Sequence, residues 1–296
     1  MTASPQQQTL FGHPAGLYTL FFAEMWERFS FYGMRAILLF YMGKGFLQYP
    51  DGQKLTVYGA YTSLVYMMPF FGGMLADRLM GARRAVVLGG LLMAAGQLLL
   101  TRENSFAFYG GLALLIAGNG YFKPNISTIV GALYPERSPK RDGGFTIFYM
   151  GINLGAAAAP LLCGYIGETQ GWHWGFGLAA VGMLTGLAVF VLPGGIARWV
   201  IMAAAVVTMA GLFTFHRDDP FSIAANVAVG IALLAAAIVT WVAIGRGGLP
   251  HEAGRPRHPE RLDEPAFGVI RKKHAVYLGT VLTIPLLALL VSGFSV

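Results

Sequence analysis

Long apolar segments separated by short polar breaks dominate the pattern of this 296-residue chain. Each segment is close to the roughly 20 residues with which a helix crosses the hydrocarbon layer of a bilayer. The breaks contain turn residues or charges, as in Tyr49-Pro50-Asp51-Gly52 and Pro193-Gly194-Gly195. We therefore predict nine membrane-spanning helices with these approximate bounds: 16–43, 56–79, 84–101, 106–133, 144–167, 174–192, 197–215, 221–244 and 275–294.

The same pattern predicts how the chain is divided. The N-terminal residues contain no Lys or Arg before the first apolar segment, so they lack the basic region of a signal peptide. The one long polar stretch is rich in Pro, Arg and Glu, and we interpret it as a linker rather than a domain. The predicted segments are a polar tail (1–14), a six-helix bundle (15–193), a helical hairpin (194–245), a cytoplasmic linker (246–273) and a further helix (274–296).

Composition supports a membrane location. The chain is 55% hydrophobic and only 12% charged, with a mean hydropathy of +0.57, whereas soluble domains are roughly 25% charged. The net charge of +7 is compatible with nucleic-acid binding, but the basic residues lie in short runs between apolar segments, so we expect no nucleic-acid partner. The partner implied is the lipid bilayer, and the fold class is an all-α membrane protein.

Basic residues also predict the orientation of the helices. With the N-terminus inside, fourteen Lys and Arg residues fall in inside loops. Outside loops then contain only four, namely Lys44, Lys54, Arg102 and Arg217. Because cytoplasmic loops carry an excess of Lys and Arg, we expect a multi-pass protein with a cytoplasmic N-terminus.

The first predicted helix contains charges that a bilayer disfavours. Glu24, Glu27, Arg28 and Arg35 all lie within it, and a charge at mid-membrane costs about 2.5–3.5 kcal/mol on insertion scales. At 100° per residue, Glu24, Arg28 and Arg35 share one narrow stripe, with Glu27 and Tyr32 beside it. This face must therefore point into the bundle or into a water-filled cavity.

A further charge, Lys123, lies in the fourth predicted helix, just before Pro124. One interpretation is that these ions only pair with each other and hold the bundle together. The other is a transport path, which ionisable residues inside membranes usually mark. Glu24 and Glu27 are the only acids deep within a predicted span, so they are the candidate proton carriers. The surplus of cations would suit an anionic group in the cavity.

Four ordered motifs give the chain a family resemblance. Residues 24–33 read EMWERFSFYG, similar to the E-x-x-E-R-F-x-Y-Y-G signature of proton-dependent oligopeptide transporters in the major facilitator superfamily, with Phe31 in place of the first Tyr. Residues 148–155, FYMGINLG, resemble the family's F-Y-x-x-I-N-x-G. Residues 122–128 are similar to its fourth-helix motif, and residues 73–84 to the superfamily loop between helices two and three.

The resemblance implies roles for individual residues and a major facilitator-type N-terminal bundle of six helices. Proton coupling is implied for Glu24, Glu27, Arg28 and Lys123. Substrate binding is implied for Arg35, Tyr32, Tyr66, Lys123 and Asn153. Gating at a cytoplasmic loop is implied for Asp77, Arg78, Arg83 and Arg84. The coupling ion would be the proton, with no cofactor and no metal.

From these features we expect a proton-coupled symporter that imports di- and tripeptides across a bacterial inner membrane. The segment 194–245 resembles the extra hairpin of bacterial members. The segment 275–294 lacks the acidic residue expected of the family's seventh helix, so we expect a truncated transporter whose missing partner is its C-terminal helical half. Two alternatives stay open: a nitrate or other small-anion transporter of the same family, and a non-transporting membrane fragment or assembly partner. An enzyme is not expected, because the sequence contains no nucleophile elbow, phosphate loop or metal motif.

Overall fold

The computed structural model of the chain describes residues 8–216, 218–256, 262–267 and 270–295. Arg217, which helped to predict the orientation, lies outside the described residues, as do parts of the predicted N-terminal tail and of the predicted linker.

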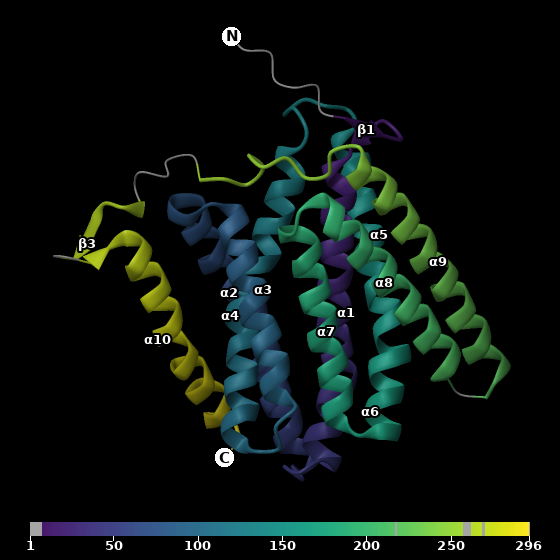
Figure 1. Ribbon diagram of the computed structural model, residues 1–296. Coiled ribbons are helices and arrows are strands. Elements are labelled where there is room, and N and C mark those ends of the chain that lie inside the picture. Colours follow the sequence, from purple (N-terminus) through teal and green to yellow (C-terminus); the bar gives the residue numbers. More distant parts are fainter. Residues whose placement is uncertain (1–7, 217, 257–261, 268–269, 296) are drawn as a thin grey trace.

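Helices account for most of the described chain (Figure 1). Two π-helical turns continue regular helices: η1 (Ala76–Met80) extends α2, and η2 (Pro160–Gly164) joins α5 to α6. The resulting nine rods correspond to the nine predicted segments within the described residues. The helices are α1 (Gly16–Lys44), α2 (Asp51–Leu75), α3 (Ala82–Leu100), α4 (Ser105–Ala132), α5 (Arg141–Ala159), α6 (Tyr165–Gln170), α7 (Trp172–Val191), α8 (Gly194–Thr214), α9 (Pro220–Gly245) and α10 (Lys272–Gly293).

Strands are confined to two short antiparallel pairs in the described residues. The first pair, β1 (Thr9–Leu10) and β2 (His13–Pro14), immediately precedes α1. The second pair, β3 (Pro265–Phe267) and β4 (Ile270–Arg271), immediately precedes α10.

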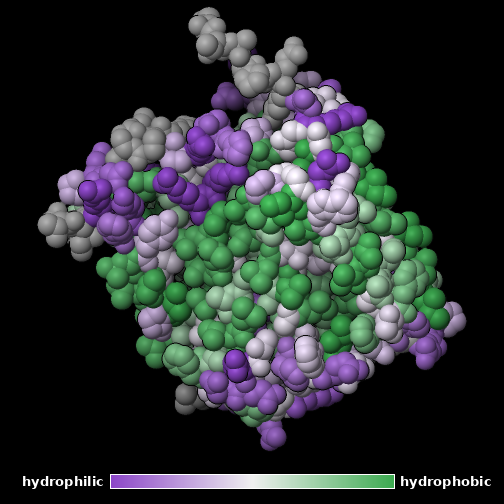
Figure 2. Space-filling view, viewed as in Figure 1, coloured by the Kyte–Doolittle hydropathy of each residue, from purple (hydrophilic) through white to green (hydrophobic). Residues whose placement is uncertain are grey.

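The surface has the pattern expected of a membrane protein. Six helical segments of the described chain are long and apolar enough to cross a membrane: Ala82–Leu100, Arg141–Gln170, Trp172–Val191, Gly194–Thr214, Pro220–Gly245 and Lys272–Gly293. Figure 2 shows a broad apolar belt between two polar ends. The predicted all-α membrane fold is therefore confirmed. Helix α1 is long enough to span as well, but its five charged residues lower its hydropathy.

Helix α1 forms the centre of the bundle. It packs against α5 on one side and α7 on another, while α3 pairs with α4 and α4 also contacts α2. Every residue from Gly16 to Phe31 is buried, which covers the whole circumference of the helix. A helix enclosed all round is normally apolar, so the charges of α1 are forced to find partners inside the protein.

Small residues let the helices around this centre approach closely. A Cβ at Gly155 of α5 would collide with the carbonyl oxygen of Met25 in α1. Pro124 has no N–H to bond the carbonyl of Gly120, four residues earlier. That carbonyl instead lies against Gly72 of α2, where a Cβ would collide with it. Glycines at such contacts are typical of membrane helix interfaces.

The remaining helices are peripheral. Helices α8 and α9 form an antiparallel hairpin on one side of the bundle, and α10 lies on the opposite side (Figure 1). Helix α10 packs mainly on α4, where the Tyr121 and Thr280 hydroxyls are 2.6 Å apart. Helix α9 also contacts α1, so the hairpin is seated on the bundle. The domain bounds given above stay a prediction.

The segment after α9 crosses the helix ends on the side of the N-terminus (Figure 1). The backbone N–H of Arg83 donates to Gly254 O at 2.8 Å, and its guanidinium donates to Pro250 O at 3.2 Å. The segment lines a cavity of about 1140 Å³ together with residues of η1, α3 and α4. Residues 246–256 of the predicted linker are therefore packed against the bundle.

Candidate functional site

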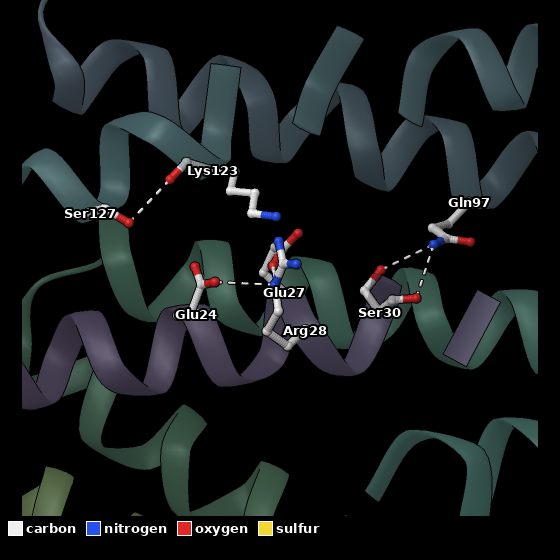
Figure 3. A network of polar contacts seen from close by, with 7 residues as sticks. All are labelled: Glu24, Glu27, Arg28, Ser30, Gln97, Lys123 and Ser127. Atoms are coloured by element: carbon white, nitrogen blue, oxygen red, sulfur yellow. Dashed lines mark hydrogen bonds and ion pairs between the residues drawn. The ribbon is translucent and has the colours of Figure 1, made fainter. Parts of the chain in front are cut away.

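Three charged side chains of α1 form a buried ion cluster. Glu24, Glu27 and Arg28 expose 2%, 0% and 3% of their surfaces. The Arg28 Nε is 3.1 Å from Glu24 Oε1 and also forms an ion pair with Glu27 Oε2 (Figure 3). The spacing i, i+4 places Glu24 beneath Arg28, as expected for one helix face. The predicted stripe thus brings these three groups together.

Lys123 reaches this cluster from the neighbouring helix. Its side chain extends from α4 toward Glu27 and Arg28 (Figure 3). Two carboxylates and two cations therefore share one site, and their formal charges cancel. Among the described residues, the second oxygens of Glu24 and Glu27 and the Arg28 Nη2 have no hydrogen-bond partner. The cluster retains capacity to take up a proton or a polar ligand.

Arg35 lies two turns further along α1 and belongs to a different group. Its Nε donates a hydrogen bond to the Tyr58 hydroxyl of α2, and its guanidinium is 5.8 Å from the centre of that ring. Arg35 is only partly buried. Although the helical wheel places it in line with Glu24 and Arg28, its partner is therefore an aromatic side chain of α2.

Tyr66 and Tyr32 lie near these groups. The Lys123 Nζ is 5.3 Å from the centre of the Tyr66 ring, within the range of a cation–π contact. Tyr66 is 62% exposed, so only one side of its ring is covered. Tyr32 is partly buried between the Arg28 and Arg35 levels of α1. Most of the predicted binding residues therefore lie on the side of the bundle that α1, α2 and α4 present.

Asn153 lies on the exposed side of α5. No hydrogen bond of its side chain is present among the described residues. The structure therefore does not join Asn153 directly to the cluster around Lys123, and its binding role stays a prediction.

The predicted gating residues lie at the helix ends on the side of the N-terminus. Asp77 and Arg78 are in the π-helical turn η1, and Arg83 and Arg84 begin α3. Asp77 forms no ion pair with these arginines in the described part of the chain. Arg83 instead contacts the segment after α9 and lies 5.4 Å from the Phe190 ring centre. Arg83 therefore takes part in packing at this end of the bundle, and the gating role of the four residues stays a prediction.

Two polar residues near the site, Tyr58 and Gln97, were not predicted from the sequence. Tyr58 has no charged neighbour in sequence, and only the α1–α2 contact reveals it as the Arg35 partner. Gln97 of α3 is fully buried and donates from one amide nitrogen to Ser30 O and Ser30 Oγ, both at 3.2 Å (Figure 3). Asn119, one turn before Lys123, is 1% exposed, and its amide atoms have no partner in the described residues. An amide within an otherwise apolar helix is the cue that could have found Gln97.

No group of three or more His, Cys, Asp or Glu side chains in the described residues is placed to hold a metal ion.

Comparison with known proteins points in the same direction as this geometry. Residues 83–201 match the POT family. An uncharacterised transporter, YclF of Bacillus subtilis, is 43% identical over 249 residues, which cover 82% of this chain and 48% of that protein. The di-/tripeptide transporter of Lactococcus lactis is 45% identical over 188 residues, which cover 61% of this chain and 38% of that protein. The chain spans about half the length, or less, of these curated relatives.

Solved structures give the same result. A crystal structure of the peptide transporter POT in complex with sulfate has a TM-score of 0.61 and 46% identity, covering 72% of this chain and 48% of that one. A POT family transporter in complex with 5-aminolevulinic acid has a TM-score of 0.65 and 31% identity, covering 98% of this chain and 49% of that one. The predicted resemblance is thereby confirmed: the chain is similar to the POT family, whose model matches residues 83–201, and it spans about half the length of the compared members.

Proposed function

We propose that the transporter to which this chain contributes imports di- and tripeptides together with protons. The observation that carries this proposal is the buried cluster of Glu24, Glu27 and Arg28 facing Lys123. A purely structural role is disfavoured, because apolar side chains would fill the centre of a bundle at lower cost than four desolvated charges. Relatives named as peptide transporters support the choice of cargo.

Coupling follows from charge balance in the cluster. With both carboxylates ionised, the two acids and two cations are neutral together. An incoming substrate carboxylate that attracts Lys123 removes one cation from the cluster. The remaining acids then share only Arg28, so one of them takes up a proton. Proton uptake and substrate binding would favour each other in this way, as reciprocal linkage requires.

The substrate carboxylate would bind between Lys123 and Arg35. Both cations are only partly buried, and each lies against an aromatic ring of α2, Tyr66 and Tyr58 respectively. Neither is held by a carboxylate at ion-pair distance in the described residues. An anionic group can therefore approach both cations from the side that Tyr66 leaves open.

The proposal includes the cellular setting. The coupling ion would be the proton without any further cofactor, the protein would act as a transporter rather than an enzyme, and the N-terminus would face the cytoplasm of a bacterial inner membrane. The excess of basic residues in the predicted inside loops supports this orientation. The helical half that the relatives possess beyond the matched part would complete the cavity.

Proton-driven uptake tests the role of the carboxylates. Proteoliposomes would contain the chain alone or together with the second half of a POT family relative, and labelled dipeptide uptake would be followed under an inward proton gradient. We expect Glu27→Gln to abolish accumulation against a peptide gradient. The matched control Glu103→Gln removes an exposed acid and should leave accumulation intact. Undiminished accumulation by Glu27→Gln would refute the proposed coupling.

The same assay separates the alternatives. Dipeptides should compete for uptake, whereas competition by nitrate and not by dipeptides would establish the small-anion function. Absence of any uptake in both preparations would establish a non-transporting membrane protein. For the carboxylate site, Lys123→Ala should weaken binding of dipeptides more than binding of their C-terminal amides. Equal losses for both ligands would contradict the assignment to Lys123.

A further inference from the structure

Two arginines and two tryptophans meet where α8 begins and α9 ends. Arg198 and Trp199 lie near the start of α8, and Trp241 lies one turn before the end of α9. The Arg198 Cζ is 4.3 Å from the centre of the Trp241 ring, and the Trp199 and Trp241 rings meet edge to face at 5.1 Å. Arg246 follows α9 directly. We call these four residues the hairpin cluster.

The guanidinium groups of the hairpin cluster have N–H donors without hydrogen-bond partners in the described residues. No carboxylate of the described residues lies within ion-pair distance of Arg198 or Arg246. The Nε of Arg198 is buried without a hydrogen-bond partner, and Arg246 donates one hydrogen bond, to Thr9 O at 3.1 Å. Each guanidinium has five N–H donors. A group with several anionic oxygens would satisfy more of these donors than the protein does.

The surroundings of the cluster place it at a membrane interface. Trp199 is 70% exposed, and exposed Trp side chains are enriched where hydrocarbon meets headgroups. Toward the middle of the hairpin, the surface continues with exposed aliphatic side chains such as Val206, Val207 and Ile238. The cluster lies at the same end of the molecule as the N-terminus and the basic linker (Figure 1). The charged, aromatic and aliphatic side chains of the hairpin therefore occur in the same order as the phosphate, glycerol region and acyl chains of a phospholipid.

We propose that the hairpin cluster binds an anionic phospholipid of the inner leaflet. The guanidinium groups of Arg198 and Arg246 contact the phosphate, since planar guanidinium forks match phosphate geometry. Trp199 and Trp241 contact the glycerol region, and the acyl chains run along the aliphatic face of the hairpin. A free phosphate would leave that apolar face unused. This binding does not depend on peptide transport.

Native mass spectrometry on the purified 296-residue chain tests the proposal. The protein would be released from micelles containing equal amounts of phosphatidylglycerol and phosphatidylcholine. We expect phosphatidylglycerol to be retained preferentially. Arg198→Ala should weaken this retention about fivefold, because a basic residue near a charged membrane surface contributes about 1 kcal/mol. The matched control Arg102→Ala removes an exposed arginine from the loop between α3 and α4 and should change nothing.

Further variants and a competition experiment test which groups bind the lipid and whether the ligand is a phospholipid or free phosphate. Arg246 is exposed, so the Arg246→Ala variant should fold. It should also weaken the retention of phosphatidylglycerol, so the test does not depend on the folding of Arg198→Ala. Trp241→Phe should reduce retention less than either arginine variant. Equal retention of the two lipids, or unchanged retention in both arginine variants, would overturn the proposal. Displacement of phosphatidylglycerol by equimolar inorganic phosphate would assign the cluster to free phosphate and overturn the lipid assignment.

Discussion

Helices α1 and α9 differ in both polarity and burial: the more charged helix is buried and the more apolar helix is exposed. Helix α1 contains five charged residues, yet it is buried around its circumference for its first four turns. Helix α9 has a mean hydropathy of 2.6 in its most apolar window, yet only 33% of that window is buried. In water, the exposed helix of such a pair would be the polar one. The inversion shows that lipid is the solvent of this surface and that polar groups gather in the centre.

The comparison also separates what each helix contributes. The charges of α1 are costly to desolvate and retain unfilled hydrogen-bond capacity, which suits a site that changes its protonation. The apolar face of α9 is stabilised wherever lipid covers it. The buried charged residues are therefore concentrated in α1, while α9 contributes a lipid-facing surface.

The largest effect is expected from breaking the cluster in α1. Arg28→Met removes the cation that both Glu24 and Glu27 contact. Removing one partner of a buried ion pair costs about 3–5 kcal/mol, because an uncompensated charge stays buried. We expect the free energy of unfolding to fall by that amount, measured by denaturant titration in mixed micelles.

A second variant distinguishes charge from shape at this cluster. The triple change Glu24→Gln, Glu27→Gln and Arg28→Met removes all three charges and should recover most of the loss in the free energy of unfolding. The control Arg102→Met alters an exposed arginine and should have an effect within about 0.5 kcal/mol. A triple variant as unstable as Arg28→Met alone would show that packing, and not electrostatics, decides stability here.

The next largest effect is expected on the exposed face of α9. Ile231 lies near the middle of the helix and is 64% exposed. If this face contacts lipid, Ile231→Asp brings a carboxylate to mid-bilayer and costs about 2.5–3.5 kcal/mol of insertion free energy. A glycosylation-based insertion assay would measure the inserted fraction, with Ile231→Ala as the control. Full insertion of the Asp variant would mean that protein or water covers this face.

A smaller effect is expected where α5 meets α1. Gly155→Ala places a methyl group against the carbonyl oxygen of Met25, and overpacking of this kind costs about 1–3 kcal/mol. Gly164 lies in the same rod, and a Cβ there would meet no atom within 4 Å. Gly164→Ala is therefore the matched control, and its effect should be within about 0.5 kcal/mol. Equal thermal stabilities of the two variants would contradict the close packing of α5 on α1.

Much of this architecture could be predicted from hydropathy alone, because membrane helices must satisfy their backbone hydrogen bonds internally and therefore appear as long apolar runs. The charges of α1 stood out for the same reason, and the structure brings Glu24, Glu27 and Arg28 together as the helical period requires. Lys123 also stood out by its charge within an apolar segment, but its position beside Glu27 and Arg28 depends on how α4 packs against α1.

Other contacts had no signal in the sequence. The Arg35–Tyr58 hydrogen bond depends on how α1 crosses α2, which no local pattern encodes. The packing of Pro250 and Gly254 against Arg83 lies in a segment that polarity alone marked as a linker. Asn153 and Tyr66 are both exposed. They were predicted by resemblance alone, and their binding roles stay a prediction.

The smallest effect is expected at an exposed ion pair, which gives the contrast to the buried cluster of α1. Asp263 Oδ1 accepts hydrogen bonds from Lys273 Nζ at 2.6 Å and from Arg271 Nη1 at 3.3 Å. The hydrogen bond from Lys273 is the main cause that holds the pKa of Asp263 below its ordinary value of 3.8. Because the folded-state pKa is lowered, any stabilisation is present above the ordinary pKa and is lost as the pH falls through the lowered pKa.

An NMR titration of the Asp263 carboxyl carbon measures this small shift directly. We expect a midpoint below 3.8, which Lys273→Met should move upward and 1 M salt should move in the same direction, since screening weakens exposed pairs. Arg255→Met is the matched control, because Arg255 pairs with Glu252 and not with Asp263. If neither 1 M salt nor Lys273→Met changes the midpoint, the pair of Asp263 and Lys273 does not form in solution. A salt-sensitive Asp263 beside a salt-insensitive α1 cluster would show that burial, and not the number of ion pairs, separates the two regions.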